Sequence, residues 1–187
     1  MSVTFKKVRI TILLIVLALV AADTWLGGLR TTSWNKPLWV VIYPINGDSS
    51  ADSQALIDKL KVEDFSSIEQ FYNEQSRRYG VAVDKPFSLQ LAPQIQNHPP
   101  EAPELDANPL VIALWSLRMR WWAWRNDPYD GPLPDIKLYA EYYEAREDSS
   151  HHSFGLEKAK LAVARIYASR HYKSQNNLVI AHELLHT

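Results

Sequence analysis

Three residues near the end of the sequence have the types and spacing to act together on a metal ion: His182, Glu183 and His186. On a helix, two histidines four residues apart project from the same side, about one turn from each other. Both imidazoles can then bind one zinc ion at Zn–N distances of about 2.0–2.1 Å. Zinc lowers the pKa of a bound water towards about 7, and a carboxylate beside the first ligand can orient that water and take its proton. The motif therefore predicts zinc-dependent peptide hydrolysis, with Leu184 and Leu185 packing against the core to seat the helix on a sheet.

The last dozen residues, 176–187, resemble the active-site segment of zincin-type metallopeptidases, with the closest likeness to membrane-anchored zincin-like proteins of bacteria. The order of expected strands and helices from residue 38 onward is loosely similar to that fold as well. The resemblance implies that His182 and His186 bind Zn2+, that Glu183 is the general base, and that the substrate is a peptide or protein. The strand expected at 161–168 is then predicted to lie at the edge of the sheet and to pair with an extended substrate.

The zincin likeness requires a third zinc ligand, usually a His, Glu or Asp downstream of the second His, but the sequence given ends one residue after His186. We therefore expect either a fragment of a longer peptidase or a remnant that holds zinc weakly and acts as a membrane-tethered interaction module. The end of the helix is expected to leave its terminal carbonyl groups unpaired. Upstream, His151 and His152 are the best candidates for a substitute ligand and His171 is the next, whereas the sequence around His98 is typical of an ordinary loop.

A sheet is needed to position this helix, and alternating or continuous apolar residues predict four strands. The first is a continuous apolar run and indicates a buried strand. In the third, alternation places Leu138, Ala140 and Tyr142 on one face. The expected strands cover residues 38–43, 87–95, 136–145 and 161–168.

Helical spacing and capping signals predict four helices around these strands. The second has a capping-box pattern over Ser66–Glu69 and stops at Gly80. The third begins with Asn108 as N-cap and Pro109 as its first residue, and the last begins at Asn177. The expected helices cover residues 50–61, 66–79, 110–125 and 177–187.

Because helices and strands are mixed without strict alternation, the pattern favours an α+β fold. We expect a zincin-like mixed sheet with packed helices in residues 31–187, preceded by an N-terminal signal or transmembrane helix in residues 1–30.

The helix expected at 110–125 is rich in tryptophan and arginine. Such a helix can lie in a membrane interface beside the N-terminal segment, or it can form a protein-docking face. We favour a third interpretation, a core helix whose arginines reach its rim and stack on indoles, because a small mixed domain needs one long buried helix. The residues concerned are Trp115, Arg118, Arg120, Trp121, Trp122, Trp124 and Arg125.

The N-terminus carries an export signal. A basic region precedes an apolar run from Ile10 to Ala22, which fits a signal peptide better than a full membrane span of about 20 residues. Val20–Ala22 offers a cleavage site, but we favour an uncleaved anchor that extends to Leu29 with Trp25 at the membrane interface. We expect a single pass in the bacterial inner membrane with the C-terminal domain in the periplasm, or secretion after cleavage as the alternative.

The composition narrows the possible functions. The chain has 187 residues, 47% of them hydrophobic, and a formal net charge of −1 at pH 7, which is ordinary for one globular domain. Near-neutral charge and the lack of a Gly-rich phosphate loop argue against nucleic-acid binding. The absence of cysteine excludes disulfides, Cys-ligated zinc and thiol catalysis.

Overall fold

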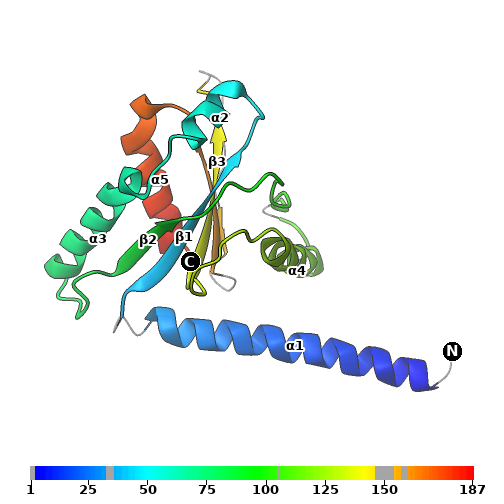
Figure 1. Ribbon diagram of the computed structural model, residues 1–187. Coiled ribbons are helices and arrows are strands. Elements are labelled where there is room, and N and C mark those ends of the chain that lie inside the picture. The colour runs from blue at the N-terminus through cyan, green and yellow to red at the C-terminus, as the bar shows by residue number, and fades with distance from the viewer. Residues whose placement is uncertain (1–2, 33–35, 105, 146–153, 157–159) are drawn as a thin grey trace.

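The computed structural model describes residues 3–32, 36–104, 106–145, 154–156 and 160–187. Within these residues, five strands form one sheet in the order β2-β1-β3-β5-β4 (Figure 1). β2, β1, β3 and β5 are parallel, and β4 pairs antiparallel with β5. The strands are β1 (Leu38–Asn46), β2 (Phe87–Leu91), β3 (Ile136–Tyr143), β4 (Phe154–Leu156) and β5 (Leu161–Tyr167). The expected mixed sheet is confirmed, and β4 is an additional strand that the apolar pattern does not reveal.

One face of the sheet is covered by helices α2 (Ala51–Ile57), α3 (Ser66–Arg78) and α5 (Lys173–Leu185), together with the short 3-10 turns η1 (Val62–Phe65) and η3 (Arg170–Tyr172). The side chains of Leu138, Ala140 and Tyr142 point into this layer, which confirms the face predicted for β3. From neighbouring elements, Ile68, Tyr72, Ile180 and Leu184 complete the same core. α5 therefore rests on a large apolar surface formed before it in the sequence.

The opposite face carries only helix α4 (Pro109–Arg125) in the described part of the chain (Figure 1). Asn108 caps this helix as expected, since its side chain accepts a hydrogen bond from the backbone N–H of Leu110 at 2.9 Å. The buried residues of α4 are Met119, Trp122 and Ala123 alone. The expectation of a core helix is therefore wrong for most of α4, because the sheet covers one side of its second half and leaves the rest exposed.

Two predicted helix starts differ from the structure. At α3 the N-cap is Phe65, which makes no side-chain cap, so the predicted capping box is absent. Glu69 instead accepts the backbone N–H of Leu89 at 2.7 Å and ties α3 to β2. α5 begins at Lys173 rather than Asn177 because η3 leads directly into it. Gly80 has a φ of 66°, in agreement with the predicted stop after α3.

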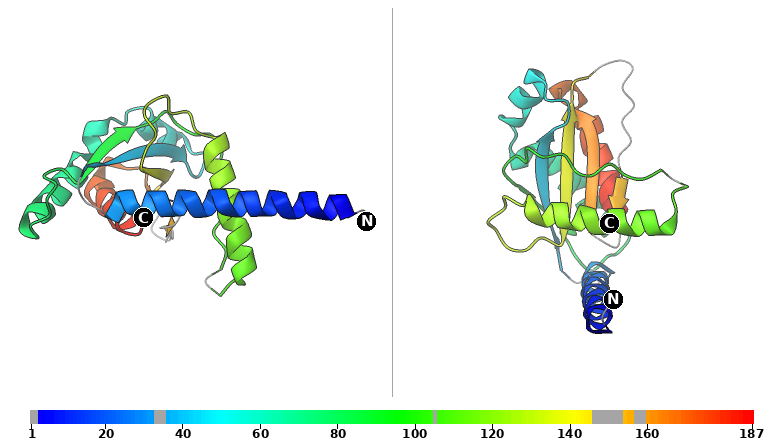
Figure 2. Two further views of the ribbon diagram at one scale, coloured as in Figure 1. Left: turned by 90° about the horizontal axis from the view of Figure 1, so that it is seen from below. Right: turned by 90° about the vertical axis from the view of Figure 1, so that its right-hand side faces the viewer.

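Helix α1 (Val3–Thr32) precedes the sheet and projects from it on the side where α4 lies (Figure 2). Its apolar side chains are largely exposed, for example Leu14 at 59% and Leu19 at 65%. Among the residues that the structure describes, no helix has both the length and the apolar character needed to cross a membrane.

Candidate metal centre

Of the predicted metal ligands, His182 lies in the last turn of α5 and His186 is the C-cap residue of that helix. The rest of α5 is fixed to the fold by polar contacts. The Asn176 side chain accepts the N–H of Tyr167 at 3.0 Å and donates to its carbonyl at 2.7 Å. Asn177 donates to the Asp64 carbonyl at 2.9 Å. Tyr72 donates its hydroxyl proton to the carbonyl of Ala181 at 2.5 Å, one residue before the motif. These contacts fix the position of α5 against both β5 and α3.

His182 and His186 project together from the solvent side of α5. Their Nε2 atoms are 3.0 Å apart, and their ring centroids are 4.6 Å apart with an interplanar angle of 81°. Two nitrogens bound to one tetrahedral zinc ion at about 2.05 Å would lie about 3.3 Å apart. The 3.0 Å separation is that of a hydrogen bond between the two rings. A small opening of this contact would bring both nitrogens to the separation that one zinc ion requires, and their donor chemistry suits zinc.

Glu183 lies between this histidine face and the core. Glu183 is only 5% exposed, whereas both histidines are exposed. Burial raises the pKa of the Glu183 carboxyl, and the nearby His182 and His186 oppose that rise. No hydrogen bond or ion pair to the Glu183 side chain is found among the described residues. The carboxylate is thus partly desolvated, has no hydrogen-bond partner among the described residues and is close to both imidazoles, an environment that suits a general base.

The end of α5 differs from the sequence prediction in two ways. Leu184 is buried at 3% exposure as expected, but Leu185 is 65% exposed, because it lies about 100° further around the helix. Two carbonyls at the helix end, which were expected to be unpaired, also have partners. The Glu183 carbonyl accepts the backbone N–H of His186 at 3.1 Å, and the Leu184 carbonyl accepts the hydroxyl of Thr187 at 2.9 Å.

A third protein ligand does not join the pair in the described part of the chain, where no group of three or more His, Cys, Asp or Glu is arranged to hold a metal ion. His171 lies in η3, at the far end of α5 and about 16 Å from His182 along the helix. His98 lies on the other face of the sheet, beside Glu141. His151 and His152 lie outside the described residues.

The edge of the sheet near this motif is β4. The expectation that the strand at 161–168 forms the edge is wrong, because β4 pairs with β5 and separates it from the edge. β4 lies next to α5. Its other side pairs with no strand among the residues described, so it leaves backbone groups available to an extended chain.

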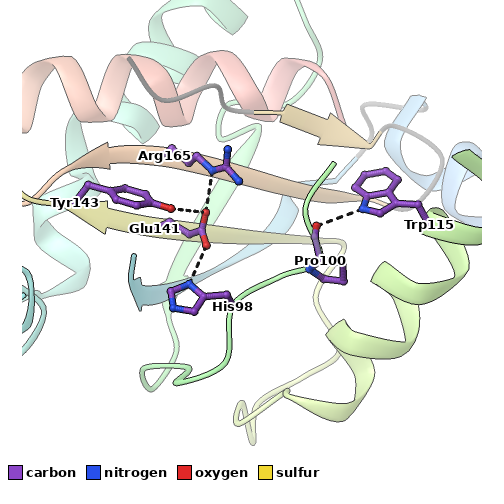
Figure 3. Close-up of polar contacts among 6 residues, drawn as sticks. All are labelled: His98, Pro100, Trp115, Glu141, Tyr143 and Arg165. Carbon is purple, nitrogen blue, oxygen red and sulfur yellow. Dashed lines mark hydrogen bonds and ion pairs between the residues drawn. The ribbon is translucent and has the colours of Figure 1, made fainter. Parts of the chain in front are cut away.

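A second group of ionisable side chains, which the sequence analysis does not identify, surrounds Glu141 on the α4 face (Figure 3). One carboxylate oxygen of Glu141 accepts from Arg165 Nε at 3.0 Å and from the Tyr143 hydroxyl at 3.3 Å. The other lies 3.4 Å from Nδ1 of His98. Burial and the neighbouring Glu141 raise the pKa of Tyr143 to about 12. This carboxylate is fully paired, so its contacts stabilise the fold.

The signal for this cluster was present in the sequence as two residues of opposite charge, Glu141 and Arg165, each within an apolar strand. Glu141 and Arg165 are directly opposite each other in the β3–β5 register. Their opposite charges could have predicted a cross-strand pair, whereas nothing in the sequence near His98 indicates that its loop reaches the same carboxylate.

In comparisons with known proteins, no family model, no curated protein and no solved structure matches the chain.

Proposed function

We propose that this protein is a membrane-tethered, zinc-dependent peptidase domain whose metal site is built on the last turn of α5. The proposal is carried by one observation: two imidazole Nε2 atoms converge to 3.0 Å beside a buried, unpaired carboxylate. His182 and His186 would hold the metal, and water or a residue outside the described part of the chain would complete its coordination. When bound, zinc would polarise the scissile carbonyl and lower the pKa of the attacking water.

Glu183 supplies the acid–base chemistry in this proposal. Its carboxylate takes a proton from the attacking water and passes it to the leaving amine. Burial helps, because a raised pKa makes the Glu183 carboxylate a stronger base towards the attacking water. The free side of β4 would hold the substrate in an extended conformation through backbone hydrogen bonds.

The tether in this proposal is α1. Its apolar residues are exposed along the helix, and its basic residues Lys6, Lys7 and Arg9 precede them. This order supports a single pass in the bacterial inner membrane with the C-terminal domain in the periplasm, or secretion after cleavage as the alternative.

Zinc binding tests the metal site directly. The full chain in detergent micelles should take up one zinc ion, measured by metal analysis after dialysis. His182→Ala and His186→Ala should each lose most of it, since a single imidazole binds zinc far more weakly than two. His171→Ala is the matched control, because it removes an exposed histidine from η3, the turn that precedes the other end of α5. Equal zinc content in all four proteins would refute the site.

Hydrolysis tests the role of Glu183. Glu183→Gln should keep the zinc and lower the cleavage rate of an unstructured protein substrate by about 10²–10⁴-fold. Full activity in this variant would exclude Glu183 as the base.

A second candidate function, a non-catalytic membrane-tethered interaction module, is supported by the lack of a third ligand among the described residues. Zinc-free native protein without peptidase activity would favour it.

A further inference from the structure

The outer surface of α4 is apolar, although that side of the helix faces away from the sheet. The exposed residues Leu110, Leu114, Leu117, Trp121 and Trp124 recur at intervals of four and three residues. At about 100° per residue they form one stripe, roughly 21 Å long, opposite the buried Met119. Leu110, Leu114 and Trp124 are 72%, 67% and 74% exposed. A helix that is apolar on both sides normally has both sides covered, so this stripe, called here the α4 stripe, needs a partner.

The charges beside the α4 stripe point to an anionic partner. α4 contains three arginines and no acidic residue. Arg118 and Arg125 are exposed along one border of the stripe, and neither forms an ion pair within the described residues. Two copies of the stripe packed against each other would bring these guanidinium groups together, which opposes self-association. Arginine with tryptophan beside leucine is instead the composition of helices that lie at the surface of anionic bilayers.

The position of α1 agrees with such a surface. α1 leaves the domain on the side of the sheet where α4 lies and extends beyond α4, away from the sheet (Figures 1 and 2). The α4 stripe lies opposite the buried Met119 and therefore also faces away from the sheet. A bilayer that receives the apolar part of α1 would therefore meet the stripe.

We propose that the α4 stripe docks on the surface of an anionic lipid bilayer, with its leucines and tryptophans in the interface and Arg118 and Arg125 on lipid phosphates. α4 is then a second membrane contact that holds the domain against the bilayer. This inference depends on neither zinc nor peptidase activity, so it can fail or succeed independently of the proposed function.

The absence of cysteine gives a direct test, because a single introduced cysteine is labelled uniquely. Leu117→Cys, Leu14→Cys and Glu74→Cys would each carry an environment-sensitive fluorophore in the full chain. Position 14 reports on α1, and position 74 is an exposed control on α3, on the other face of the sheet. The proteins are reconstituted in nanodiscs of phosphatidylcholine alone or with 30% phosphatidylglycerol, with spin-labelled lipid as a shallow quencher.

In anionic nanodiscs we expect the label at position 117 to be quenched several-fold more strongly than the label at position 74. Phosphatidylcholine alone, or the added pair Arg118→Glu and Arg125→Glu, should reduce this quenching at least twofold while position 14 stays quenched. Circular dichroism checks that the variants fold. Quenching at position 14 with none at position 117 would overturn the proposal, and so would equal quenching in both lipids. If the label at position 117 became shielded from solvent as the protein concentration rises, whatever the lipid, the partner of the α4 stripe would be a second copy of the chain.

Discussion

Glu183 and Glu141 are both buried carboxylates, at 5% and 2% exposure, but their surroundings are opposite. Glu141 has an arginine, a tyrosine hydroxyl and a histidine on its oxygens. Glu183 has no such partner among the described residues, and it lies beside two exposed imidazoles whose Nε2 atoms converge. A buried charge without a partner costs free energy. The comparison indicates that Glu141 contributes to stability, whereas the ionised form of Glu183 lowers it, a cost that agrees with the general-base role proposed above.

The largest effect on stability should come from removing the partner of Glu141. Arg165→Met leaves a carboxylate that is 3% exposed without its guanidinium, and loss of one member of a buried ion pair costs about 3 kcal/mol. For a protein of this size that corresponds to a fall in Tm of about 6–12 °C, measured by circular dichroism in detergent. Arg118→Met, on the exposed surface of α4, is the matched control and should leave Tm unchanged. A fall of less than 2 °C for Arg165→Met would mean that the contrast between the two carboxylates is wrong.

A smaller change in stability, an increase rather than a decrease, is expected when Glu183 is replaced by Gln at neutral pH. The folded state raises the pKa of this carboxyl above its ordinary value of 4.5, so folding favours the protonated form. The wild type therefore loses stability as the pH rises from about 4.5 through the folded-state pKa. Glu183→Gln lacks this loss, so it should match the wild type near pH 4 and be more stable than the wild type at pH 7.

Urea unfolding at the two pH values, with a chelator present to keep the site free of metal, measures this difference. Glu74→Gln, an exposed carboxylate on α3, should show no such pH dependence. A Glu183→Gln variant that is less stable at pH 7 would mean that the carboxylate has a stabilising partner.

His98 should contribute less than Arg165 to the free energy of unfolding through its contact with Glu141. Its side chain is 47% exposed and its contact with the carboxylate is long, at 3.4 Å. His98→Ala is therefore expected to cost about 0.5 kcal/mol, measured by the same urea unfolding. A loss as large as that of Arg165→Met would show that the loop, rather than the cross-strand pair, supports Glu141.

The smallest effect is expected for His182→Ala in the presence of a chelator, which should change the free energy of unfolding by less than about 0.5 kcal/mol, because the side chain is exposed. A larger loss would mean that the His182 imidazole contributes to the stability of the fold. The contrast between a structural Glu141 cluster and a metal-binding pair beside Glu183 would then be wrong.

The sequence predicted the helices and strands that have strong apolar patterns. The prediction failed for elements whose bounds are set by contacts between residues far apart in the chain. The buried strand at 38–43 and the cap at Asn108 follow from local residue types. β4 is only three residues long and carries too little pattern to be recognised. The start of α5 was missed because the helix continues from η3 at Lys173, so Asn177 lies inside it and donates its side-chain amide to Asp64 and Ser67.

The candidate site was predicted in its residue types and spacing, and the structure adds what spacing alone does not contain. The burial of Glu183 depends on how α5 packs against the sheet, and so does the exposure of Leu185. The same reason explains α4, since its tryptophans and leucines are as apolar as core residues and only the packing of the sheet decides which of them are covered.

The contacts that fix α5 also bear on how the protein is made. The Tyr72–Ala181 hydrogen bond joins residues 109 positions apart, and the bond between Asn177 and Asp64 joins residues 113 apart. At a synthesis rate of 5–20 residues per second, Tyr72 leaves the ribosome roughly 5–20 s before Ala181. During that interval the apolar surface of α3 and the sheet is uncovered, and a chaperone that covers it would protect the nascent chain from aggregation.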